Sequence, residues 1–397
     1  MTGAAVLLVL SALVALGPLS TDAYVPGLPR LTEDLGTSAS AAQLTVTTCL
    51  VGLAVGQLVA GPMSDALGRR RPLLFGLAVY TAAGFLCAVA PNVGVLVLCR
   101  GVQGVGGAFA LVIAYACVRD RCSGKAAARY FSLLLLVTGL APVLAPLAGA
   151  QILRFSDWRG VFTALAVLSA AVLVAAAVVL PESLAPQRRS SGGLRATGAV
   201  YLRLLGDRRL VGYALANAFV FAAVFAYIAG SPFVLQDVHG LSPQRYSVVF
   251  AVNAVGLVVA AQASGRLVRQ VDPRVLLATG VVGSAVGGVA VLAVVVSGAG
   301  LWPLLAAFFV VVTSVGLVLP NAPALVLEDH GSHAGAAAAL LGFAQFLFGG
   351  LAAPLVGHGA VAMAAVMAGL GVAALVVLVV SHTPQHERHL AAPGGPA

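Results

Sequence analysis

Long stretches without a charged residue are the feature that most constrains this chain. Ten stretches of at least 18 residues contain no Asp, Glu, Lys or Arg: 1–21, 35–64, 72–99, 101–118, 130–153, 160–181, 210–236, 246–265, 275–327 and 330–386. A helix needs about 20 apolar residues to cross a bilayer. The last two stretches are 53 and 57 residues long and are interrupted by Ser297–Gly300 and Gly357–Gly359, so each predicts two spans. The pattern predicts twelve spans. The charged fraction of 9% excludes a soluble enzyme, because soluble domains carry about 25%.

All twelve spans are expected to be helical, because uninterrupted apolar runs of this length differ from the alternating strands of a membrane barrel. The predicted fold is an all-α membrane protein with twelve transmembrane helices in two six-helix bundles. The expected domains are a bundle over 1–180, a flexible cytoplasmic linker over 181–209, a bundle over 210–381 and a cytoplasmic tail over 382–397. Approximate spans are 4–26, 41–62, 73–91, 94–116, 130–153, 160–180, 210–232, 245–264, 275–297, 301–325, 334–356 and 360–381.

The distribution of basic residues predicts the orientation in the membrane. With both termini in the cytoplasm, the cytoplasmic segments hold 17 of the 22 Lys and Arg residues, as the positive-inside rule requires. This predicts a multi-pass protein of the cytoplasmic membrane. The first apolar run is not preceded by a basic residue and is expected to remain as a span. The basic residues lack aromatic interleaving, so the net charge of +9 gives no reason to expect nucleic acid as a partner.

Asp22 and Arg100 are the two charges in the interior of predicted spans. A charge in lipid is costly and usually faces a bundle interior or a water-filled cavity. At 1.5 Å per residue they lie about 6 and about 12 Å from the outer end, depths compatible with contact or a single water bridge. Asp22 is the candidate proton site, with Arg100 adjusting its titration. The alternative is a static ion pair that joins the first span to the fourth.

Two further segments combine small residues with charge or proline. The turn after the second span contains the candidate gating residues Gly61, Asp65, Gly68, Arg69 and Arg70, in a pattern that suits a charge-linked latch. The fifth span contains Gly139, Pro142, Pro146 and Gly149, a composition that favours a hinge or a static kink.

These motifs resemble the major facilitator superfamily. The run from Gly61 to Pro72 is similar to its signature loop, and Arg100–Ala108 is similar to the Arg-plus-Gln-Gly motif of proton-coupled members. The glycine-proline run of the fifth span resembles the motif of exporters, with altered glycine spacing. Together with Ser20–Pro29, Arg119–Arg121 and Trp158–Phe162, they resemble the bicyclomycin/chloramphenicol-type drug:proton antiporters. The resemblance implies that Asp22 binds the proton and that Arg100 supports it.

The expected partners are protons, the lipid bilayer and a small lipophilic substrate. Candidate substrate-binding residues are Tyr24, Gln103, Tyr115, Asn217, Phe221, Tyr227, Asn253, Asn321 and Gln345. Each of the polar residues among them is equally suited to a helix–helix hydrogen bond. No cofactor or metal is expected, and the histidines at 382, 386 and 389 are interpreted as part of a solvated tail.

The sequence predicts proton-coupled efflux of lipophilic drugs by alternating access of the two halves. Uptake of a small organic solute by symport and export of an endogenous metabolite remain alternatives. An enzyme or receptor lacks support, because no span contains a nucleophile–base arrangement or metal-ligand spacing. One chain can enclose a pathway, so a functional monomer is expected.

Overall fold

Twelve helices long and apolar enough to cross a membrane lie in the described part of the chain. The computed structural model describes residues 3–122, 124–189, 193–329, 334–357 and 359–382. Residues 383–397 of the predicted tail and His358 in the predicted turn lie outside the described residues. The α-helices are α1 (Gly3–Asp22), α2 (Leu28–Asp34), α3 (Ala39–Leu67), α4 (Arg70–Ala88), α5 (Val93–Arg121), α6 (Gly124–Ile152), α7 (Trp158–Val179), α8 (Gly193–Leu205), α9 (Arg208–Pro232), α10 (Pro243–Leu267), α11 (Pro273–Ser297), α12 (Leu301–Asp329), α13 (Ala334–Ala352) and α14 (Ala360–His382).

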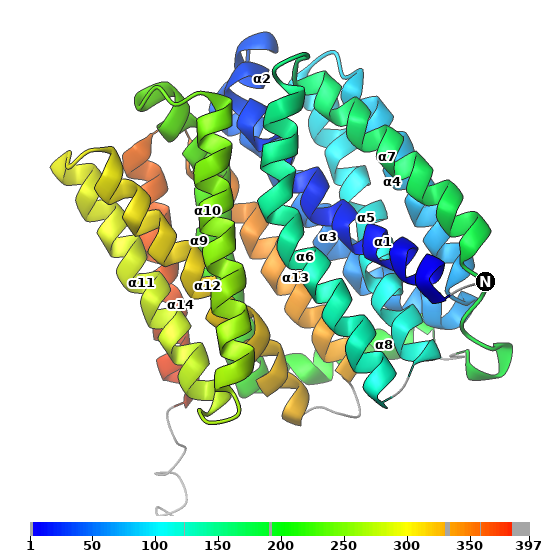
Figure 1. The fold of residues 1–397 in the computed structure, drawn as a ribbon. Helices are drawn as coiled ribbons and strands as arrows, with labels where there is room; N and C mark the ends of the chain where they lie inside the picture. Colours follow the sequence, from blue (N-terminus) through cyan, green and yellow to red (C-terminus); the bar gives the residue numbers. More distant parts are fainter. Residues whose placement is uncertain (1–2, 123, 190–192, 330–333, 358, 383–397) are drawn as a thin grey trace, which may run out of the picture.

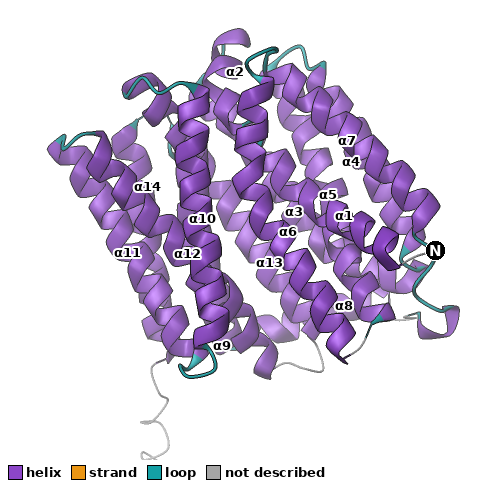
Figure 2. Ribbon diagram, in the orientation of Figure 1, coloured by secondary structure: helices purple, strands orange, loops and turns teal. Residues whose placement is uncertain are grey.

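The fold is entirely helical over the described residues, as predicted (Figure 2). In Figure 1, α1, α4, α5 and α7 lie to the right and α10, α11, α12 and α14 to the left, with α6 and α13 near the middle. The two halves meet where α3 packs on α13 and where α6 packs on α10. We call the top of this view the α2 end and the bottom the α8 end, after the short helices found there.

The connection between the halves is more structured than the expected flexible linker. It contains the 3-10 turn η2 (Pro186–Arg188) and the helix α8. The Tyr201 hydroxyl of α8 donates to the carbonyl oxygen of Leu58 in α3 at 3.3 Å. Leu204 is buried, whereas Leu202 is 74% exposed. The linker is therefore attached to the first half by an amphipathic helix.

Glycines of the fourth span allow its neighbours to approach closely. A Cβ on Gly104 of α5 would stand 2.0 Å from the carbonyl oxygen of Cys49 in α3. A Cβ on Gly106 would stand 2.6 Å from the carbonyl oxygen of Gly76 in α4. Helices in lipid associate through such close packing, because lipid tails are as apolar as the side chains between them. These contacts fix the position of α5, which carries Arg100.

Candidate functional site

Asp22 is the last residue of α1, at a break in the first spanning segment. The chain continues through the 3-10 turn η1 (Val25–Gly27) into α2. Asp22 is 4% exposed, and its Oδ1 atom is buried without a hydrogen-bond partner in the described part of the chain. Burial removes the water that would solvate an ionised carboxylate in such a place, which costs free energy. Burial and an unpartnered oxygen atom thus set Asp22 apart from the hydrogen-bonded polar residues around it.

Arg100 caps the carboxyl end of α1. Its side chain is completely buried, and its Nη2 atom donates to the Ser20 carbonyl oxygen at 3.0 Å, while Nη1 donates to the Ser20 hydroxyl at 3.2 Å. The last carbonyl groups of a helix have no partner within it, and a cation near them also interacts favourably with the helix dipole. None of the ion pairs found among the described residues joins Asp22 to Arg100. The positive charge of Arg100 nevertheless acts on the Asp22 carboxylate through space.

The other donors of Arg100 tie three helices together. Nη1 donates to Oε1 of Gln103 at 2.6 Å, and Nε donates to the carbonyl oxygen of Thr45 in α3 at 3.4 Å. The guanidinium lies 4.8 Å from the ring centre of Tyr24 and 5.5 Å from that of Phe162, distances typical of cation–π contact. The Tyr24 hydroxyl is hydrogen-bonded to the Thr45 hydroxyl at 2.9 Å. Two candidate binding residues, Tyr24 and Gln103, thus surround Arg100.

The second half places aromatic and amide side chains in two groups. Nδ2 of Asn253 in α10 donates to the Tyr227 hydroxyl of α9 at 2.9 Å. The Tyr227 ring stands 5.8 Å from Phe250 and 5.0 Å from Phe308 of α12. We call Tyr227, Tyr246, Phe250 and Phe308 the aromatic cluster. The 3-10 turn η1, which follows Asp22, packs against α9 and α10, so the helices that carry the cluster adjoin the break in the first spanning segment.

The second group joins α9 to α13. Nδ2 of Asn217 donates to Oε1 of Gln345 at 3.2 Å. The Phe221 ring is 4.8 Å from Phe225 and 5.6 Å from Phe346. An amide pair beside stacked rings offers both polar and apolar contacts to a small molecule.

Two predicted binding residues take part in helix contacts within one half. The Tyr115 hydroxyl is 3.5 Å from that of Thr138, and its ring stacks on Phe131 at 6.1 Å. Tyr115 lies fifteen residues along α5 from Arg100, which is about 22 Å at 1.5 Å per residue. Nδ2 of Asn321 donates to the Ser264 hydroxyl at 2.7 Å and joins α12 to α10. These contacts serve packing of the helices.

The predicted hinge residues of α6 face different neighbours. Gly149 packs on the carbonyl oxygen of Ala23, in the break that follows Asp22, and Gly139 faces Val258 of α10 in the other half. Pro142 and Pro146 lie between them, inside a continuous helix. The motif therefore spans from the Asp22 segment to the interface between the halves.

The predicted gating turn forms a charge network at the α8 end. Arg69 is 4% exposed and pairs with Asp65 at 2.5 Å and with Asp120 at 2.8 Å. Its Nη1 atom also donates to the Ser64 hydroxyl at 2.8 Å. Burial opposes the charged form of Arg69, but the hydrogen bond to Asp120 and the charge of Asp65 raise its pKa overall. Gly61 is not in close contact with another helix, because a Cβ there would stand 4.0 Å from its nearest neighbour, the Val112 side chain.

Glu182 completes this network, a role that the sequence interpretation missed. Its carboxylate accepts the backbone N–H groups of Arg69 at 2.8 Å and Arg70 at 3.2 Å, and so caps α4. Burial opposes ionisation, but these bonds and those from Leu184 and Ser183 lower the pKa of Glu182. Gly68 has a φ of +88°, and a Cβ there would stand 2.5 Å from Oε2 of Glu182. The sequence signal that could have indicated this role is an acidic residue directly after Pro181, at the end of the sixth span.

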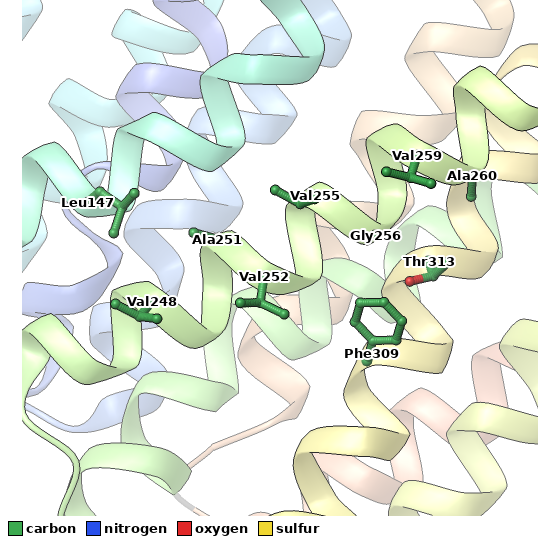
Figure 3. A pocket seen from close by; sticks show the side chains of 10 residues that line it. All are labelled: Leu147, Val248, Ala251, Val252, Val255, Gly256, Val259, Ala260, Phe309 and Thr313. Carbon is green, nitrogen blue, oxygen red and sulfur yellow. The ribbon is translucent and has the colours of Figure 1, made fainter.

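An apolar groove of about 600 Å³ runs along α10 (Figure 3). Val248, Val252, Val255 and Val259 of α10 line it, with Leu147 of α6 at one end and Phe309 and Thr313 of α12 at the other. These valines alternate around the helix with Tyr246, Phe250 and Asn253, so the two sets lie on opposite faces. Helix α10 therefore separates the aromatic cluster from this groove.

The comparisons with known proteins agree with this architecture. The model of the Major Facilitator Superfamily matches residues 10–354. The uncharacterized MFS-type transporter YdgK of Bacillus subtilis (strain 168) is 36% identical over 363 residues, 90% of each chain. A bicyclomycin resistance protein homolog of Haemophilus influenzae is 30% identical over 355 residues, 88% of each chain.

A solved D-xylose-proton symporter shares the fold, with a TM-score of 0.77 at 17% identity over 94% of this chain and 96% of that chain. The chain has twelve spans, matches the family model and aligns with relatives over most of their length. It therefore belongs to the major facilitator superfamily and is a membrane transporter.

Proposed function

We propose that this transporter expels small lipophilic drugs from the cell in exchange for incoming protons. The observation that carries the proposal is the buried, unpartnered Oδ1 atom of Asp22. It lies at a helix break where Arg100 binds Ser20 and where η1 packs against α9 and α10 of the other half. In this proposal Asp22 binds a proton from one side of the membrane and releases it to the other as the halves rock. Arg100 holds the end of α1 and supplies the nearby positive charge.

The substrate class is argued from the chemistry of the second half. The half-buried rings of Phe221 and Phe346 offer apolar contacts, and the Asn217–Gln345 amide pair offers few fixed donors and acceptors. Such a surface accommodates lipophilic molecules of differing shape. The relative that is named as a bicyclomycin resistance protein homolog supports export of an antibiotic over uptake.

The proposed orientation places the α8 end in the cytoplasm. The loops at that end carry Arg69–Arg71, Arg266, Arg269 and Arg274, whereas Arg30, Arg154 and Arg159 lie toward the α2 end. This arrangement supports a cytoplasmic-membrane protein with both termini inside. One chain contains both halves of the pathway, so the proposed unit is a monomer.

The test is antibiotic resistance in a host that lacks its own efflux pumps. Chloramphenicol, bicyclomycin and other lipophilic antibiotics are assayed with and without a protonophore. The native chain is expected to raise resistance to at least one drug, and Asp22→Asn and the protonophore to abolish it. Glu33→Gln, an exposed acid on α2, is the matched control and keeps activity. Increased drug sensitivity would favour the uptake alternative, and resistance that persists with Asp22→Asn would contradict the role of Asp22.

A further inference from the structure

Gln43 is a completely buried residue of α3 whose side chain crosses to the other half. Its Nε2 atom donates to the carbonyl oxygen of Ala229 in α9 at 3.1 Å and to that of Gly357 at 2.9 Å. Helix α9 reaches Pro232 three residues later and continues as the π-helix η3 (Phe233–Val238), so its regular hydrogen bonding is interrupted there. One side chain thus binds two segments of the second half at a weak point of α9.

Two more glutamines cross the interface in the opposite direction. Nε2 of Gln236 in η3 donates to the carbonyl oxygen of Pro26 at 3.1 Å. Nε2 of Gln244 in α10 donates to the carbonyl oxygen of Ala150 in α6 at 3.0 Å. We call Gln43, Gln236 and Gln244 the glutamine latch. The latch joins the two bundles by four direct hydrogen bonds, two from Gln43 and one each from Gln236 and Gln244.

The acceptors of the latch adjoin the Asp22 segment. Pro26 lies in η1, which follows the break after Asp22. Ala150 follows Gly149, and Gly149 packs on the carbonyl oxygen of Ala23. Separation of the halves at the α2 end therefore requires the amides of Gln236 and Gln244 to leave the two segments that enclose this break.

We propose that the glutamine latch holds the α2 end of the transporter closed, and that its three residues set the balance between the two access states. The inference rests on the proposed alternating-access cycle. Amide donors and carbonyl acceptors are uncharged, so the latch binds the halves without burying an ion at their interface. An interhelical hydrogen bond in a membrane protein changes such an equilibrium by about threefold on average.

The test is hydrogen–deuterium exchange of the full chain in lipid nanodiscs, with methionine as the replacement because it keeps the length of glutamine. We expect Gln43→Met, which loses two bonds, to raise exchange about tenfold in residues 23–38 and 233–242 at the α2 end. Gln236→Met and Gln244→Met lose one bond each and are expected to raise it about threefold. In alternating access the opposite end closes, so residues 62–70 and 268–272 at the α8 end are expected to exchange more slowly.

The reciprocal change distinguishes a latch from a general loss of stability, which would raise exchange at both ends. Gln151→Met is the matched control, since Gln151 lies at the α2 end but accepts from Arg154 of its own half. Unchanged exchange, a rise at both ends or an equal effect of Gln151→Met would overturn the proposal.

Gln236 and Gln244 are only half-buried, so their variants carry the test if Gln43→Met does not fold. This readout requires neither a drug nor a proton gradient, so failure of the latch is distinguishable from failure of proton-coupled efflux.

Discussion

Gly149 of α6 faces the carbonyl oxygen of Ala23 so closely that a Cβ atom at Gly149 would stand 1.7 Å from that oxygen. The glycine-proline segment of the fifth span thus packs directly on the break that carries Asp22. We expect any bending of α6 at Pro142 or Pro146 to act on this break through backbone contact rather than through a flexible side chain.

Replacement of Gly149 by alanine is expected to reduce transport by at least about tenfold, because backbone must move to admit the methyl group. Gly139→Ala is expected to have a small effect, since its Cβ would meet Val258 at an ordinary 3.4 Å. Gly17→Ala in α1 is the control, because a Cβ there has no neighbour within 4 Å. Drug efflux at matched expression gives the comparison, and equal activity of the Gly149 and Gly17 variants would rule out the proposed contact.

Arg100→Lys is expected to impair both stability and efflux. A lysine ammonium is a point charge and cannot reproduce the fork that reaches Ser20, Gln103 and Thr45 together. Each lost hydrogen bond from a charged group costs about 2 kcal/mol. Thermal unfolding in detergent measures the loss of stability, and Arg154→Lys, a change of an exposed arginine, is the control. A native unfolding temperature for Arg100→Lys would show that the cap on α1 contributes little.

The charge network at the α8 end is expected to behave as one coupled unit around Arg69. Asp120 is 10% exposed and Asp65 is 44% exposed. We expect Asp120→Asn to cost about 3 kcal/mol and Asp65→Asn about 1 kcal/mol or less. Both costs are expected to fall sharply in an Arg69→Ala background. A double-mutant cycle of thermal stability measures this coupling, and strictly additive effects would contradict it.

The stability contributed by Glu182 is expected to depend on pH. Because the pKa of Glu182 is lower in the folded chain than the ordinary value of 4.5, its ionised form stabilises the fold. That contribution is complete above 4.5 and is lost as the pH falls through the lower folded value. Glu182→Gln is therefore expected to unfold at a lower temperature than the native chain at about pH 7, with the difference shrinking toward about pH 3. Glu33→Gln serves as control, and a difference that grows in acid would refute the capping role.

The number and positions of the spans followed from the sequence because charged residues are costly in lipid and are therefore rare inside the apolar runs. The predicted first span ended near Pro26, whereas the spanning segment continues through η1 and α2 to Asp34. Its outer part carries Arg30 and Glu33, and such charges cannot be assigned to a helix by an apolar pattern alone. The helix α8 was missed for the same reason, since its amphipathic sequence lies among Gly, Ser and Arg residues.

The partners of Arg100 were less accessible from sequence. Opposite charge suggested Asp22 as the partner of Arg100, whereas in the structure the guanidinium donates to the carbonyl oxygen of Ser20. Backbone acceptors leave no signal of their own, although Pro26 and Pro29 do indicate that α1 must end nearby. The glutamine latch was missed because Gln236 and Gln244 lie outside the predicted spans. The amide of Gln43 lies in a span, but the sequence does not show whether it faces a neighbouring helix or the other half.

Infrared difference spectroscopy of the purified protein tests the central claim, that Asp22 takes up and releases a proton inside the membrane. Spectra recorded at high and low pH in lipid report the carbonyl stretch of a carboxylic acid that becomes protonated in an apolar environment. We expect such a band in the native chain and in Glu33→Gln, and its loss in Asp22→Asn. A band that persists unchanged in Asp22→Asn, or its absence from the native chain, would contradict the account.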